Sequence, residues 1–204
     1  MAVSRSPRLV LFILILMVPA CQTAKLHYSA GDRLWAGVDA YERGDYDRAL
    51  PLLQPFAESG NAVAQEKLGQ MYWLGLGVPQ DSVEAAKWLR KASDQDVADA
   101  QTTLATLYLL GDGVNRNHVE AARLLRITAE QGIPEAQFFL GLLYRYGEGV
   151  PRNNVQALKW LELAAAQGKD SALKACEALM REMKPQEISE AEEFVREWKP
   201  KPAR

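Results

Sequence analysis

A repeat of 36 residues is the feature of this sequence that most constrains its fold. Three blocks, residues 61–96, 97–132 and 133–168, align without a gap. The recurring columns are Ala64, Ala100 and Ala136; Leu68, Leu104 and Leu140; Tyr72, Tyr108 and Tyr144; Gly75, Gly111 and Gly147; and Ala85, Ala121 and Ala157. Self-similarity at a period of about 20 to 50 residues is typical of solenoids, in which similar units stack side by side. The sequence therefore predicts a stack of at least three like units.

Each block has the pattern of two antiparallel helices. Ala64, Leu68 and Tyr72 are four residues apart, so we expect them on one face of a first helix. The Gly-x-Gly-Val that follows ends this helix, because glycine adopts the left-handed conformation that helix ends often need. A capping residue with Glu or Gln three positions later then begins a second helix. These capping residues are Asp81, Asn117 and Asn153.

The two ends of the stack depart from the repeat. Ala49 precedes its equivalent Ala85 by 36 residues, but Tyr41 precedes Tyr72 by only 31, so residues 33–60 form a first helix pair with a shorter turn. Residues 169–198 continue as C-terminal capping helices, and we expect the Pro- and Lys-rich tail, 199–204, to fray. One helix pair cannot bury its own apolar face, so neighbouring pairs must stack. The composition of the chain, rich in Ala, Leu, Glu and Gln, agrees with an all-α fold.

The repeat resembles a known family. The pattern Ala-x3-Leu-Gly-x2-Tyr-x2-Gly-x-Gly-Val-x2-Asp/Asn-x3-Ala-x2-Trp-Leu is similar to the Sel-1-like repeat, a relative of the tetratricopeptide repeat. It covers residues 61–168 fully and 33–198 loosely, with Asp96, Ala105 and Leu124 as local departures. The resemblance implies an all-α, right-handed superhelical solenoid of antiparallel helix pairs. It also implies that the solenoid binds proteins or peptides in its groove, without implying a shared partner.

The N-terminus has the features of an export signal. Arg5 and Arg8 precede ten apolar residues, 9–18, and the last of these begins the sequence Val-Pro-Ala-Cys, so residues 1–20 are predicted to be a signal peptide. The apolar run is shorter than the roughly 20 residues that a membrane-spanning helix needs. Residues 18–21, Val-Pro-Ala-Cys, resemble a bacterial lipobox, in which Cys21 becomes the lipidated N-terminal residue and carries palmitate. Residues 21–32 would then link the lipid to the repeats. Ordinary cleavage after Ala20, which would release a soluble periplasmic or secreted protein, is the alternative. The residue after the cysteine is Gln22 and not the Asp that resembles an inner-membrane retention signal, so the outer membrane, facing the periplasm, is favoured.

The sequence offers little that could carry chemistry. The formal net charge is −2 and no run of Lys and Arg occurs in the repeats, so no nucleic-acid partner is expected. His27 and His118 have no Cys or carboxylate partners at metal-ligand spacing, so we expect no metal and no cofactor. Cys176 follows a helical apolar pattern and is expected to be a small buried residue. We therefore predict no catalytic residue and no enzymatic activity.

The predicted binding surface is the face of the first helices that points away from Ala64, Leu68 and Tyr72. In tetratricopeptide relatives these positions line the concave groove, and aromatic residues and Arg are concentrated at interface hot spots. The predicted groove residues are Trp35, Glu66, Gln70, Trp73, Leu109, Phe138, Leu142 and Arg145, with Asp39, Thr102 and Thr106 at equivalent positions. The alternative is that some of these side chains pack against the adjacent repeat.

Three functions follow from these features. The first is a membrane-anchored periplasmic scaffold or adaptor that binds another protein of the bacterial envelope, in the groove, as a helix or an extended peptide. The second is a periplasmic regulator that restrains a sensor or an export protein through the same groove. The third is a β-lactam-binding or hydrolysing protein, as some secreted relatives are described. Those relatives are Cys-rich, whereas residues 61–168 contain no Cys, so this function is disfavoured.

Overall fold

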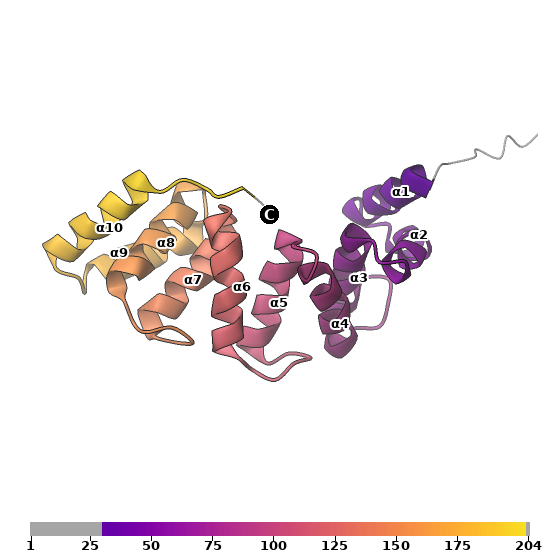
Figure 1. The fold of residues 1–204 in the computed structure, drawn as a ribbon, viewed down its shortest axis with the longest axis horizontal. Helices are drawn as coiled ribbons and strands as arrows, with labels where there is room; N and C mark the ends of the chain where they lie inside the picture. Colours follow the sequence, from indigo (N-terminus) through magenta and orange to yellow (C-terminus); the bar gives the residue numbers. More distant parts are fainter. Residues whose placement is uncertain (1–29, 203–204) are drawn as a thin grey trace, which may run out of the picture.

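The computed structural model of the chain describes residues 30–202, and all of its regular structure is helical. The helix pairs follow one another along an arc (Figure 1). No β-strand occurs within this part of the chain. The helices are α1 (Ala30–Glu42), α2 (Tyr46–Glu58), α3 (Ala62–Leu74), α4 (Ser82–Ser93), α5 (Ala98–Leu110), α6 (His118–Glu130), α7 (Pro134–Tyr146), α8 (Asn154–Ala166), α9 (Asp170–Met180) and α10 (Pro185–Glu197).

The predicted helix pairs are confirmed. The first and second helices of each repeat, α3 with α4, α5 with α6 and α7 with α8, pack more extensively than each second helix packs on the next first helix. The predicted caps also hold: the Asp81 carboxylate accepts hydrogen bonds from the backbone N–H groups of Val83 and Glu84. Asn117 and Asn153 cap α6 and α8, and each accepts one backbone hydrogen bond through its amide oxygen, from Glu120 and Gln156. The chain is thus an all-α solenoid of antiparallel helix pairs.

The core is built from the face of each first helix that meets its own second helix. Ala64, Leu68 and Met71 of α3 are buried there, and the equivalent positions of α5 and α7 are buried too. Tyr72, predicted on the same face, is only half-buried. At about 100° per residue, position 71 lies closer to the direction of position 64 than position 72 does, so a spacing of seven fills the core better than one of eight.

A ladder of buried glutamines joins the repeats and was missed at the sequence level. Gln65, Gln101 and Gln137 are spaced by 36 and each donates a hydrogen bond to a backbone carbonyl near the end of the preceding second helix, at 3.1–3.3 Å. In two of the three repeats a further glutamine donates to the ladder, from Gln95 to Gln65 and from Gln167 to Gln137. These residues recur every 36 positions, but as polar residues they fall outside the apolar periodicity that predicts a core.

The C-terminal end departs from the repeat path. Helix α10, at the predicted position of the closing helix, folds back and packs on α8 rather than on α9. The described part of the predicted tail, residues 199–202, is not frayed as expected: the backbone N–H of Lys201 donates to the carbonyl of Glu130 at 2.8 Å, and its ammonium donates to the Glu130 carboxylate at 2.8 Å. The return of α10 over α8 brings the tail to the end of α6, and this gives it partners that its own composition does not reveal.

Among residues 30–202, no helix combines the length and the apolar character that a bilayer span would require. The predicted signal peptide, Cys21 and most of the linker lie outside the described residues.

Candidate protein-binding surface

The first helices present a continuous, partly exposed stripe. Its positions follow a spacing of four, three and four residues, which keeps them on one side of a helix. We call this surface the first-helix stripe. Its members are Val63, Lys67, Gln70 and Leu74 in α3, Asp99, Thr103, Thr106 and Leu110 in α5, and Glu135, Phe139, Leu142 and Tyr146 in α7. In the first half of the stack, α1 with α3 and α3 with α5 contact one another more extensively than the second helices of neighbouring repeats do, as expected for the inner layer of a curved stack.

Three large apolar side chains form the most exposed part of the first-helix stripe. Leu74, Leu110 and Tyr146 are 54%, 56% and 62% exposed and occupy the same position at the C-terminal end of successive first helices. Single exposed apolar residues are common, but their recurrence at one position of the first helices makes this row a candidate surface for a partner. The sequence prediction missed all three, although their spacing of 36 residues was visible.

The predicted groove residues form a row rotated by roughly 60° from the first-helix stripe, at 100° per residue. Gln70 and Leu142 belong to both sets. The rotated flank faces the next repeat, because consecutive first helices lie side by side. Most of the predicted groove residues outside the first-helix stripe therefore pack against the adjacent repeat, which was the alternative to a free binding surface.

The contacts of these residues cross to the following repeat. The indole N–H of Trp73 donates to Asp112 at 3.2 Å. The guanidinium of Arg145 pairs with Glu182 at 2.9 Å and is largely covered. The remaining predicted residues of this flank pack on apolar clusters: Leu109 lies against the central core, and Phe138 and Leu142 lie against the cluster of α8, α9 and α10.

Two predicted residues stand apart, at opposite extremes of exposure. Trp35 of α1 is 61% exposed and remains available to a partner. Glu66 is only 3% exposed, so its side chain lies inside the stack and not on its surface. Whether any of the predicted groove residues binds a partner stays a prediction.

Glu66 is a buried carboxylate whose contacts only partly offset the cost of burying its charge. Its Oε2 lies 3.2 Å from the ammonium of Lys67, while its Oε1 is buried without a hydrogen-bond partner. Burial raises the pKa of Glu66, and the attraction of Lys67 opposes this only in part. The pKa of the neighbouring Tyr41 is also raised, to about 12, by burial first and by the charge of Glu66 second. The Tyr41 hydroxyl donates to the side-chain oxygen of Gln70.

Replacing Glu66 by Gln should stabilise the chain at neutral pH by about 1 kcal/mol, because the variant has no charge to bury. A carboxyl whose folded-state pKa is raised destabilises the fold as pH rises from its unfolded pKa through its folded pKa. The gain should therefore be small near pH 4 and grow towards pH 7. Urea denaturation at both pH values measures it, with the exposed Glu190→Gln of α10 as control. A gain that is the same at both pH values, or a loss at pH 7, would contradict this account.

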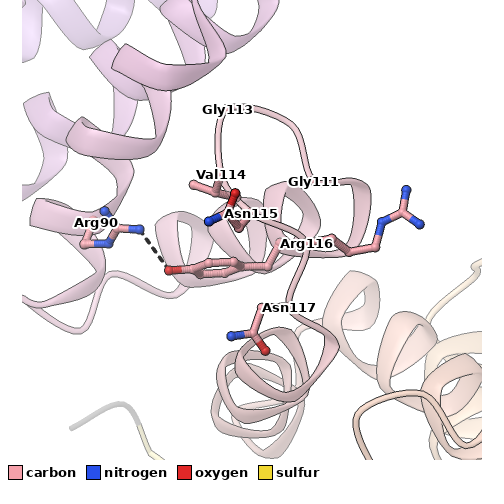
Figure 2. A pocket seen from close by; sticks show the side chains of 8 residues that line it. Arg90, Gly111, Gly113, Val114, Asn115, Arg116 and Asn117 are labelled. Carbon is pink, nitrogen blue, oxygen red and sulfur yellow. Dashed lines mark hydrogen bonds between the residues drawn. The ribbon is translucent and has the colours of Figure 1, made fainter.

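An open cavity of about 670 Å³ lies beside the loop that joins α5 to α6 (Figure 2). On its α4 side, Arg90 donates to the hydroxyl of Tyr108 at 2.8 Å, and one repeat later Arg126 donates to Tyr144 in the same way. Figure 2 shows the guanidinium of Arg116 pointing away from Arg90. The two cations do not converge on one point, so the cavity lacks the arrangement that would hold an anion. The Arg–Tyr pairs join a second helix to the next first helix.

His118 and Cys176 are residues of the types that could bind a metal or act as a nucleophile, but neither lies in a site that suits this role. His118 at the start of α6 lies 3.5 Å from Glu148 of the next repeat. Within residues 30–202, no group of three or more potential metal ligands comes together. Cys176 is buried, and burial raises the pKa of its thiol to about 12, with a smaller contribution from Glu162. A thiol with this pKa is hardly ionised at neutral pH, so it is a poor nucleophile.

Comparison with known proteins agrees with this architecture. The family model described as Sel1 repeat matches residues 62–97, 98–133 and 134–169, which together are more than half of the chain. A search of the curated proteins finds no match.

Two solved structures share the fold at a similar level of identity. One is c5321, a protective antigen present in uropathogenic Escherichia coli strains and displaying an SLR fold; it is 34% identical with a TM-score of 0.65, covering 71% of this chain and 32% of that one. The other is a Sel1 repeat protein from Oxalobacter formigenes, 33% identical with a TM-score of 0.64, covering 70% of this chain and 58% of that one. This chain thus spans about a third and somewhat over half of the lengths of these two proteins. Proteins with these repeats typically serve as protein–protein interaction scaffolds rather than enzymes. The three matched repeats, and the helix pairs that they form, show that the chain belongs to the Sel1 repeat family.

Proposed function

We propose that this chain is a membrane-anchored scaffold of the bacterial periplasm that binds another envelope protein through its first-helix stripe. The observation that carries the proposal is the row of exposed apolar side chains, Leu74, Leu110 and Tyr146, on a solenoid of interaction repeats. Large apolar side chains at equivalent positions suit a partner that lies across several repeats, as a helix or an extended peptide does. The proposal includes no catalytic step, and turnover of nitrocefin by the purified chain would contradict it.

The anchor in this proposal is lipidation of Cys21. The support is the sequence alone, namely the basic start, the short apolar run and the position of the cysteine. The roughly eight residues from Gln22 to Ser29, which precede α1, would reach at most about 28 Å when fully extended, so the repeats would work close to their membrane. In Cys21→Ala, membrane association and palmitate labelling should both be lost. Retention of both would refute the anchor while leaving the binding surface untouched.

Site-specific crosslinking in cells tests the binding surface. A photoreactive residue at Tyr146 should give a discrete crosslinked product, and one at Val119 should not. Val119 is the comparison position, because it is 67% exposed and, with Val83 at 54%, forms a second apolar row 36 residues apart at the start of the second helices. Crosslinking at Val119 with no product at Tyr146 would move the binding surface to the other helix layer. The identity of the captured protein separates a scaffold from the alternative, a regulator that restrains a sensor or an export protein.

A further inference from the structure

The last described residues of the chain occupy a site on the second helices, as a ligand would. The ring of Trp198 meets Trp160 of α8 edge to face, with 6.5 Å between ring centroids. Three residues later, Lys201 is held at the end of α6 by two hydrogen bonds to Glu130, one from its backbone N–H and one from its ammonium. Pro200 lies over Gly132, where an added Cβ would be 3.5 Å from the proline ring. Figure 1 shows this end of the chain running back from α10 towards α6. We call residues 198–202 the tail segment.

The receptor side of this contact recurs 72 residues earlier, where the tail segment is absent. Trp160, Glu130 and Gly132 correspond to Trp88, Glu58 and Gly60. Glu58 and Glu130 are each the last residue of a second helix, where a carbonyl has no partner inside its own helix. Gly60 and Gly132 share one backbone conformation, with φ values of +97° and +96°. The surface of α2 and α4 therefore repeats the set of groups that holds the tail segment on α6 and α8.

The intervening pair of second helices, α4 and α6, lacks this set. Its equivalents are Leu124 in place of the tryptophan, Asp94 in place of the glutamate and Asp96 in place of the glycine. The three groups thus occur together only at alternate positions among the described repeats. The α4–α6 position provides a control surface with the same backbone.

The α2–α4 surface is open where the α6–α8 surface is covered. A Cβ added at Gly60 would meet no atom within 4 Å. The ammonium of Lys91 rests on the ring of Trp88 at 3.9 Å, and the indole N–H of Trp88 is buried without a hydrogen-bond partner. Glu58 is exposed and accepts one hydrogen bond, from Gln54 of its own helix.

We propose that the surface of α2 and α4 binds an extended segment of a partner protein that has the chemistry of the tail segment. This chemistry is an aromatic residue followed two positions later by proline and three positions later by lysine. The aromatic ring replaces Lys91 at the face of Trp88, the proline lies over Gly60, and the lysine pairs with Glu58 through both its ammonium and its backbone N–H. The site lies on the second helices, apart from the first-helix stripe, so it does not depend on the proposed function. A separate partner is favoured over a second copy, because each tail is tethered to its own α6 and meets that site at a high effective concentration.

A labelled peptide of residues 194–202, Phe-Val-Arg-Glu-Trp-Lys-Pro-Lys-Pro, tests the proposal by fluorescence anisotropy with the purified chain. We expect saturable binding that weakens about tenfold in Glu58→Gln, which removes a charge-assisted hydrogen bond at an exposed position. Asp94→Asn, the equivalent change on the control surface, should leave the affinity unchanged. Trp88→Leu, which copies Leu124, should also weaken binding, and circular dichroism checks that each variant is folded.

Two outcomes would overturn the proposal. The first is a failed peptide test, seen either as no saturable binding or as equal affinities of the Glu58→Gln and Asp94→Asn variants for the peptide. The second is self-association of the chain through this surface, which sedimentation of the chain without peptide measures. A dimer that Glu58→Gln dissociates would assign the site to the tail of a second copy instead of a partner protein.

Discussion

Gly113→Ala is expected to destabilise the chain by about 3 kcal/mol, whereas Gly111→Ala in the same loop should cost only about 1 kcal/mol. Both glycines have a positive φ, of +68° and +71°, so both replacements carry the strain of a side chain in the left-handed region. They differ in what the new Cβ would meet. At Gly113 it would lie 2.0 Å from the backbone carbonyl oxygen of Ser82, whereas at Gly111 the nearest atom is the Cβ of Arg116 at 3.2 Å. A neighbouring backbone cannot move aside as a flexible side chain can, so only the first change displaces one repeat from another.

Urea denaturation followed by circular dichroism measures both variants against the unchanged chain. The comparison isolates the contact between repeats, because the conformational strain is common to both positions. Gly149→Ala offers a second test one repeat later, since its Cβ would lie 2.2 Å from the carbonyl oxygen of His118. Equal losses at Gly111 and Gly113 would mean that strain alone decides the cost and that the loop does not join the repeats.

The sequence was sufficient to predict the helix pairs but not to predict which side of the first helices is exposed. The columns at Ala64 and Leu68 and the N-cap at Asp81 each depend on contacts within one repeat, so a single block predicts them. The contact between one first helix and the next is made partly by polar groups, such as Trp73 with Asp112 and a buried Glu66. No apolar periodicity marks that flank, so the sequence does not show which of its side chains also contact the next repeat. Exposed apolar residues at a fixed repeat position would have been the better signal.

The C-terminal end shows a second limit. Sequence pattern predicted the closing helix, but the partners of the tail depend on which neighbour α10 packs against. Lys201 and Glu130 are 71 residues apart and belong to no shared repeat column. A contact of this kind is visible only once the path of α10 over α8 is known.

Gln137→Ala is expected to cost about 3 kcal/mol, and the same change at Gln101 should cost about 1 kcal/mol less. Both side chains are buried, and both donate to a carbonyl of the preceding second helix, so each replacement leaves a similar cavity and an unpaired carbonyl. Gln101 also donates, at 3.4 Å, to the carboxylate of Asp96, which is exposed and can bond to water instead. Only Gln137 also accepts a hydrogen bond, from Gln167 at 2.8 Å, whereas the side-chain oxygen of Gln101 has no partner. The difference between the two losses in stability therefore measures the hydrogen bond from Gln167, at the end of α8, to Gln137 of α7.

A double-mutant cycle of Gln137 and Gln167, followed by urea denaturation, measures the coupling energy of this hydrogen bond. We expect a coupling energy of about 1 kcal/mol, the usual net value of a buried hydrogen bond. Equal losses for Gln137→Ala and Gln101→Ala, or no coupling in the cycle, would show that Gln167 adds nothing to the bond that Gln137 makes with Ala129 of the preceding repeat. Coupling would mean that Gln167, at the end of α8, helps to hold the Gln137 amide where it bonds to that preceding repeat, so that a displaced repeat would leave a buried donor and a buried acceptor unpaired. The apolar columns alone do not impose this requirement, since alanine and leucine faces tolerate small shifts in packing more easily than hydrogen bonds do.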